Sequence, residues 1–303
     1  MTRHGCAPLL LFPLFLTAFG ACGGRAEYDG PQYGRAPAGG RAQTYTFAVH
    51  PLHNPKKMIE AYQPLMDYLN ANLGGTKIIL EASRDYACFE AKYGKREPDF
   101  LLPNPWQTLQ AMEAGYHVIA MAGEKSDFKG IFIVRKDSGI KRPSDLIGKA
   151  VSYPSATALA ACVMPQSFLH RNGVDVNKDI ENRYVGSQES SIMNAYLKLT
   201  AAGATWPTPW RAFLREHPTE ATCLEVAWET ETLINNSVMA RDDVPAPLLN
   251  RVQSLLTGLH ENEKGKSILG GMETARFFSK GDDDYDIVRS YVSRFEKEVR
   301  KVK

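Results

Sequence analysis

The segment Val151-Ser-Tyr-Pro-Ser-Ala-Thr-Ala-Leu-Ala-Ala161 has the pattern of a strand that passes through a short polar turn into the start of a helix. The first turn of a helix leaves backbone N–H groups without intrahelical partners and carries the positive end of the helix dipole. We therefore expect a small anion to bind the amides after Pro154, including that of Ala156, with the Ser155 and Thr157 hydroxyls beside them. From these residues alone, an ordinary helix capped by Ser155 is the alternative.

Strand-like and helix-like segments alternate before this junction. Alternating or continuous apolar residues predict strands at 44–50, 77–81, 99–102 and 116–122, and apolar residues at helical spacing predict helices at 58–69, 86–93 and 108–114. Such alternation is typical of a parallel sheet, whose ligands bind beyond the carboxyl ends of the strands. The loops that follow two of these strands contain His53 and Asn104, which we therefore treat as candidate ligand contacts.

A second α/β unit follows, with strand-like segments at 129–135, 182–185 and 224–228 and a helix at 163–172. The turn at 186–191 is another polar start of a helix, so we expect Ser187 and Gln188 to contribute to the anion site. Segment 234–240 has the pattern of a strand that returns the chain to the first unit. These observations predict two lobes around a cleft, joined by a two-segment hinge: lobe I at 42–125 and 234–303, and lobe II at 126–233.

The N-terminus has the pattern of an export signal. Arg3 and His4 precede an apolar run at 9–21, which is too short for a stable membrane anchor and ends at Cys22. Small residues directly before a cysteine are typical of a lipoprotein signal, so we expect residues 1–22 to be a signal peptide with lipidation at Cys22; ordinary cleavage nearby is the alternative. The Gly- and Pro-rich segment 23–42 is expected to be a flexible tether. Together these features predict a folded domain on the extracytoplasmic side of a membrane.

Composition and cysteine spacing exclude several functions. The 303-residue chain has a formal net charge of +2 at pH 7 and no long basic block, so nucleic acid is not an expected partner. Cys88, Cys162 and Cys223 lack the spacing of metal ligands, and no metal or other cofactor is expected. An oxidising compartment would permit a Cys162–Cys223 pair, with free thiols as the alternative. No Ser-His-acid order and no pair of catalytic carboxylates stands out, so we predict no enzymatic activity.

Several further motifs occur in a specific order and spacing, namely Pro64–Leu69, Asp99 with the following Asn-Pro turn, Asp145–Lys149, Pro154–Thr157, Gly186–Ser187, Glu261–Leu269 and Asp284–Tyr285. Together they resemble the PhnD-like branch of the type II periplasmic binding proteins, which bind phosphate, phosphite or phosphonate for ABC importers. The resemblance covers nearly all of the chain after the export segment. It implies two α/β lobes, each a mostly parallel sheet flanked by helices, with phosphoryl oxygens held at the helix start that contains Ser155 and Thr157.

The resemblance also implies the partners, namely a small phosphorus oxyanion and an ABC permease in the inner membrane. Two positions depart from the family: Gln188 stands where relatives usually have a histidine, and Thr200 where they have an acidic residue. A site without that cation partner and that carboxylate favours a simple oxyanion over an aminoalkylphosphonate. A sensor or signalling lipoprotein of the same fold with another ligand is the alternative function.

Two further groups of residues are candidates for the cleft. The segment Trp206-Pro-Thr-Pro-Trp210 would place an aromatic wall and the Thr208 hydroxyl at its mouth, with simple packing as the alternative. For the pair His50 and His53, we prefer an exposed loop position to a ligand contact, and a ligand contact to a metal site.

Overall fold

The computed structural model describes residues 43–302, which belong to one compact unit. The predicted signal peptide at 1–22, the predicted lipidation site Cys22 and the predicted tether at 23–42 lie outside the described residues. Among residues 43–302, no helix has both the length and the apolarity needed to cross a membrane. Cys88, Cys162 and Cys223 are free thiols.

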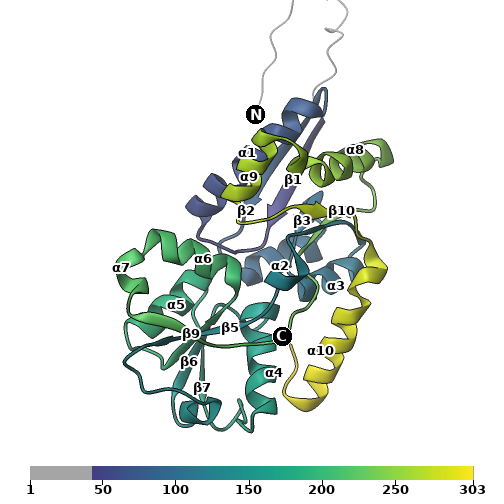
Figure 1. Ribbon diagram of the computed structural model, residues 1–303. Coiled ribbons are helices and arrows are strands. Elements are labelled where there is room, and N and C mark those ends of the chain that lie inside the picture. Colours follow the sequence, from purple (N-terminus) through teal and green to yellow (C-terminus); the bar gives the residue numbers. More distant parts are fainter. Residues whose placement is uncertain (1–42, 303) are drawn as a thin grey trace, which may run out of the picture. The chain divides into compact units, whose positions relative to one another are not determined.

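The first sheet is built from both ends of the described chain (Figure 1). Its strands are β1 (Gln43–Val49), β2 (Thr76–Ala82), β3 (Phe100–Leu102), β4 (Tyr116–Ala122), β10 (Ser237–Arg241) and β11 (Phe277–Phe278). The strand order is β11-β4-β10-β3-β1-β2. We use lobe I for the elements around this sheet.

Helices follow the strands of lobe I as the apolar spacing predicts. They are α1 (Pro55–Asn72), α2 (Tyr86–Gly94), α3 (Pro105–Glu113), α8 (Ala246–Thr257), α9 (Glu263–Gly271) and α10 (Asp286–Glu298), with short 3₁₀ turns at η1 (Lys125–Asp127), η4 (Leu259–Glu261) and η5 (Asp282–Tyr285). In α1 the predicted apolar face is buried through Met58, Tyr62 and Leu65, among others. The helix α3 begins earlier than the apolar spacing predicts, because the Asn104 side chain caps its first turn.

The second sheet lies within the middle of the chain, and we use lobe II for the elements around it. Its strands are β5 (Ile131–Arg135), β6 (Ala150–Tyr153), β7 (Glu181–Tyr184), β8 (Ala202–Thr205) and β9 (Leu224–Glu229), in the order β7-β6-β8-β5-β9. Its helices are η2 (Pro143–Leu146), a π-helical turn η3 (Leu159–Val163), α4 (Met164–Arg171), α5 (Gln188–Tyr196), α6 (Pro207–Glu216) and α7 (Pro218–Ala221).

The predicted α/β architecture is confirmed, and the sheets are mixed in direction. Pairs joined by a helical crossover, such as β1 with β2 and β6 with β7, are parallel. In contrast, β5 and β10 run antiparallel to both of their neighbours. Each of these two strands is the first that the chain forms after it crosses between the lobes, so no helical crossover fixes its direction.

Among residues 43–302, two connecting segments cross between the lobes, and the C-terminal residues make a further contact between them. Residues 123–130 lead from β4 to β5, and residues 230–236 lead back from β9 to β10. After α10, which packs against α3 in lobe I, the last described residues contact lobe II. There the Arg300 guanidinium donates to Gln166 Oε1 at 2.7 Å, to the Ala156 carbonyl at 3.0 Å and to Cys162 Sγ at 3.3 Å. The C-terminal residues therefore support the turn before η3.

Candidate functional site

A small cavity lies between the two lobes, where the strands β1, β3, β6 and β8 end. Its volume is about 10 Å³, which is room for about one water molecule. It is lined by His50, Tyr86 and Asn104 from lobe I, Phe128 and Asn236 from the two crossing segments, and Ala158, Leu159, Ala160, Ala161, Gln188 and Trp206 from lobe II. This is the end of the sheets at which open α/β folds bind ligands.

The helix after β6 begins at Leu159 rather than directly after Pro154. Residues 154–158 form a turn, in which the Ser155 carbonyl accepts from the N–H of Ala158 at 3.3 Å. The helix opens with the π-helical turn η3 and continues without a break into α4, and the N–H of Val163 donates to the Ala158 carbonyl at 3.2 Å. Such π-helical turns are rare in proteins, and many of those that occur lie at functional sites.

Three backbone amides at this helix start have no acceptor within residues 43–302. The N–H groups of Leu159, Ala160 and Ala161 donate to no other group in the described part of the chain. The three residues are buried, with exposures of 0%, 4% and 1%, and all of them line the cavity. A buried amide without a partner is unfavourable, and at a helix start the dipole adds a positive potential. The arrangement is therefore suited to the oxygens of an anion.

Asn104 connects the lobes beside this helix start. Its side-chain oxygen accepts from the N–H of Gln107 at 3.0 Å, which caps α3. Its amide nitrogen donates to the Thr157 carbonyl at 3.2 Å, across the interface between lobe I and lobe II. Asn104 is 4% exposed, so both interactions are shielded from water. The residue thus fixes the distance between α3 and the turn before η3.

His50 enters the cavity from the end of β1. Its Nδ1 lies 2.8 Å from the Leu102 carbonyl oxygen, which can only accept, so the proton is on Nδ1. Burial lowers the pKa of His50 to about 4, although the bond to Leu102 acts in the opposite direction. The imidazole is therefore neutral at physiological pH. Its Nε2 makes no hydrogen bond with any described residue and is an acceptor at the cavity.

Gln188 lines the same cavity as His50, from the first turn of α5. Its side-chain oxygen accepts from the Thr205 hydroxyl at 2.8 Å, and its amide nitrogen donates to the Tyr86 hydroxyl oxygen at 3.2 Å. These two bonds hold the amide in one orientation, at 2% exposure. The Tyr86 hydroxyl hydrogen is left available to a ligand.

A carboxylate lies behind the turn that precedes the helix start. Glu90, from α2, accepts from the Thr157 hydroxyl at 2.6 Å and from the Gln107 amide at 3.0 Å. Burial raises the pKa of Glu90, and these two hydrogen bonds partly oppose that shift. The Thr157 hydroxyl hydrogen is therefore already engaged with Glu90 in this arrangement.

Replacing Glu90 with glutamine is expected to tighten oxyanion binding about fivefold. The change removes a negative charge close to the helix start, and two like charges roughly 8 Å apart at an effective dielectric of about 40 repel by about 1 kcal/mol. Calorimetric titration with phosphate would measure the gain. The exposed Glu113→Gln at the end of α3 is the matched control, and equal affinities for both variants would contradict the expectation.

The same variant has a predicted effect on the pH dependence of stability. Because burial raises the folded-state pKa of Glu90, the folded protein binds more protons than the unfolded chain above the ordinary glutamate pKa. The parent protein therefore loses stability as the pH rises through that folded-state pKa. Glu90→Gln should melt at a higher temperature than the parent near about pH 7, and the difference should vanish near about pH 4.

The residues predicted for the site fall into three groups. Asn104, Gln188 and Trp206 lie together around the cavity, with the Trp206 ring 5.7 Å from that of Phe128. The sequence predicts an exposed loop position for His50, whereas His50 is 2% exposed.

The second group forms the turn before η3. The Ser155 hydroxyl lies 3.0 Å from that of Thr157, and the Ala156 carbonyl accepts from Arg300. None of these three residues lines the cavity, although Thr157 is bonded to Asn104, which does.

The third group lies outside the cavity. Ser187 caps α5, since its hydroxyl oxygen accepts from the N–H of Ser190 at 3.0 Å. Thr208 lines a neighbouring hollow and accepts from Arg211 at 3.4 Å. His53 lines two hollows beside Lys57 and Glu216, where burial lowers its pKa.

Ion pairs join the lobes near His53. Lys57 of α1 pairs with Glu189 at 2.9 Å and with Glu216, both in lobe II. Glu273, which follows α9, pairs with Arg211 at 3.2 Å and with Arg215 on α6. Sequence reasoning did not detect these pairs, because their members are far apart in the chain. They hold the lobes together next to the cavity.

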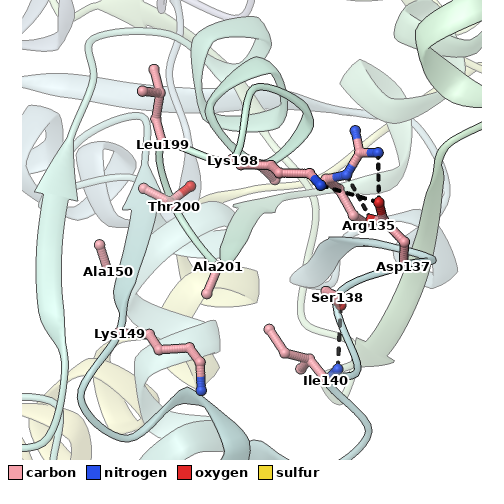
Figure 2. A pocket seen from close by; sticks show the side chains of 11 residues that line it. Arg135, Asp137, Ser138, Ile140, Lys149, Ala150, Lys198, Leu199, Thr200 and Ala201 are labelled. Atoms are coloured by element: carbon pink, nitrogen blue, oxygen red, sulfur yellow. Dashed lines mark hydrogen bonds and ion pairs between the residues drawn. The ribbon is translucent and has the colours of Figure 1, made fainter.

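A larger hollow of about 390 Å³ lies on lobe II, where β6 and β8 begin (Figure 2). Its basic residues are already paired: Arg135 and Lys198 both point toward Asp137, with nitrogen–oxygen distances of 2.7 Å and 3.2 Å. Lys149, on the other side, donates to the Asp145 carbonyl at 2.5 Å. This hollow is wider than the cavity between the lobes but lies at the amino ends of the parallel strands, opposite the end at which such folds bind ligands.

Two α/β lobes with two chain crossings and a polar cavity between them define the type II periplasmic binding-protein fold. The model of the family described as "ABC transporter, phosphonate, periplasmic substrate-binding protein" matches residues 47–285. The chain therefore belongs to this family, whose members are substrate-binding proteins and not a class of enzymes.

Solved structures of similar proteins share this fold. A binding-protein component of a phosphonate ABC transporter from Pseudomonas aeruginosa matches with a TM-score of 0.78 and 14% identity, over 85% of this chain and 88% of that one. PhnD1 from Prochlorococcus marinus, solved with methylphosphonate, has a TM-score of 0.78 and 18% identity, over 84% and 99%. The alkanesulfonate-binding protein of Xanthomonas axonopodis has a TM-score of 0.61 and 14% identity, over 87% and 96%.

Proposed function

We propose that this protein binds a small phosphorus oxyanion between its lobes and delivers it to an ABC permease. The observation that carries the proposal is the set of unpaired, buried amides of Leu159, Ala160 and Ala161 at the cavity. Several hydrogen bonds from fixed donors can compete with water for such an anion, and a helix start supplies them without a charged side chain. The family membership supports the same class of ligand.

The proposed contacts are the amides together with the side chains around them. Asn104, Gln188 and Trp206 line the cavity and would contact the ligand directly. Ser155, Ala156 and Thr157 would act by shaping the turn, and Ser187 by capping the helix that carries Gln188. For His53 and Thr208 the positions support an indirect role at the mouth of the cleft.

Binding requires the lobes to separate. A cavity of about 10 Å³ is too small for a phosphate ion, which has five heavy atoms instead of the single one of water. We propose that the crossing segments 123–130 and 230–236 form the hinge between lobe I at 42–125 and 234–303 and lobe II at 126–233. The ion pairs of Lys57 and Glu273 would break on opening and re-form around the ligand.

The proposed location is the periplasmic side of the cell envelope, with Cys22 lipidated as a membrane anchor. The apolar run at 9–21 directly before Cys22 supports the anchor, and the family supports the compartment and the permease partner. A lipid on a long tether would keep the protein close to the permease.

A ligand screen tests the function. The purified protein would be titrated calorimetrically and melted with phosphate, phosphite, methylphosphonate and sulfate. A phosphorus oxyanion at about a hundred times its Kd should stabilise the fold by about 2.7 kcal/mol. If none of the phosphorus oxyanions changes the melting temperature or releases heat, the proposed function is wrong.

A further inference from the structure

We propose that the cavity selects oxyanions that carry a hydroxyl hydrogen, such as singly protonated phosphate or phosphonate, over oxyanions without one, such as sulfate or a sulfonate. This inference rests on the proposed function and narrows its ligand class. It comes from two acceptors on residues that line the same cavity as the unpaired amides, because an anion without a hydrogen to donate would not satisfy them.

The first acceptor is Nε2 of His50. The ring cannot turn this atom into a donor without losing the 2.8 Å bond from Nδ1–H to the Leu102 carbonyl, which is itself a fixed part of β3. The ring also packs against the aromatic side chains of Tyr86 and Phe89, with centroids at 6.2 Å and 6.4 Å. The orientation and the protonation of His50 are therefore both set by the protein.

The second acceptor is Oδ1 of Asn236, from the crossing segment that leads back to lobe I. This oxygen is fully buried and receives no hydrogen bond from any described residue, and the residue is 3% exposed. Asn236 lines the same cavity as His50 and the amides. The described lining thus has donors at the helix start and at the Tyr86 hydroxyl, and unsatisfied acceptors at His50 and Asn236.

An anion without a hydroxyl hydrogen leaves these acceptors unpaired and places its own oxygens against them. A buried acceptor without a partner is costly, and a site built to bond a hydroxyl group rejects close analogues that lack it. None of the residues that line the cavity is Lys, Arg, Asp or Glu. A singly charged ligand is therefore easier to accommodate than a doubly charged one, because no side-chain cation compensates the second charge.

Methylphosphonate and methanesulfonate test the inference on the unaltered protein. At mildly acidic pH both are singly charged and nearly equal in shape, but only the phosphonate carries a hydroxyl hydrogen. Calorimetry is expected to show about a hundredfold tighter binding of methylphosphonate, with sulfate weaker than phosphate by at least as much. If methanesulfonate binds as tightly as methylphosphonate, the inference is overturned while the proposed function stands. If no phosphorus oxyanion binds, both are wrong.

A His50 variant tests whether this residue causes the preference for methylphosphonate. His50→Phe keeps an aromatic ring beside Tyr86 and Phe89 but removes the acceptor, and should reduce the preference for methylphosphonate about tenfold. His170→Phe, at an exposed position in the last turn of α4 and outside the cavity lining, should leave the preference unchanged. If His50→Phe does not fold, the comparison of methylphosphonate with methanesulfonate on the unaltered protein still tests the inference. An unchanged preference in a folded His50→Phe would remove His50 from the argument and overturn it.

Discussion

Replacing Gln188 with glutamate is expected to weaken oxyanion binding by a few hundredfold. The change adds no atoms and keeps the shape of the side chain, and the hydroxyls of Thr205 and Tyr86 can both donate to the new carboxylate. It places a negative charge on the cavity lining, however. Two like charges roughly 5 Å apart at an effective dielectric of about 20 repel by about 3 kcal/mol. Calorimetric titration with the best phosphorus oxyanion measures the loss.

A pH series separates the charge from any change in shape. The introduced carboxylate is buried, so its pKa should be raised, and lowering the pH should neutralise it and restore part of the affinity. Asn194→Asp adds the same charge further along α5, outside the cavity, and should change the affinity little. If Gln188→Glu binds as tightly as the parent at neutral pH, the anion does not bind beside Gln188.

Much of the fold could be predicted because its signals are local. The apolar period of α1 and the alternation of strands with helices are properties of neighbouring residues, and they identify both lobes. The directions of β5 and β10, in contrast, could not be predicted from local signals. They depend on the side from which the chain enters the sheet after it crosses between the lobes, and the residue pattern of Ile131–Arg135 or Ser237–Arg241 does not indicate that side.

At the junction for which the sequence predicts an anion site, the local geometry differs from the prediction. Ser155 is a favourable helix cap, yet its hydroxyl is used within the turn, by Thr157, and the helix begins later, at Leu159. Alanine-rich sequence does not distinguish the first helical residue from the last residue of a turn, because alanine is accepted in both. The wider spacing of η3 likewise has no signature in this sequence.

The buried positions of His50 and Glu90 could not be predicted from a single sequence. A histidine after a strand and a glutamate on a helix are usually exposed, and only the contacts with Leu102 and Thr157 reveal that these two face the interlobe region. The position of His50 directly after β1 was the available signal, since the carboxyl ends of parallel strands meet at the ligand side. For Glu90, whose partners Gln107 and Thr157 belong to α3 and to lobe II, no local signal exists.

Gly130→Ala is expected to lower both the stability and the affinity, because Gly130 touches the helix start from behind. An added Cβ would lie 2.5 Å from the Ala160 carbonyl oxygen and 2.7 Å from the ring of Pro165. Gly130 cannot move away easily, since its N–H and its carbonyl are both bonded to Thr230 of the other crossing segment, each at 2.9 Å. The helix start therefore has to shift.

Such overpacking typically costs about 1–3 kcal/mol, or about 5 °C in melting temperature for a chain of this size. Because the shift moves the amides of Leu159, Ala160 and Ala161, oxyanion affinity should fall about tenfold as well. Gly270→Ala in α9 is the control: no atom lies within 4 Å of its added Cβ, and alanine favours a helix, so stability should stay equal or rise. The two losses have one cause and should appear together, since the helix that the added methyl group displaces is the one whose amides we propose as the anion contacts. A Gly130→Ala protein that melts lower but binds with full affinity would show that the ligand is held elsewhere.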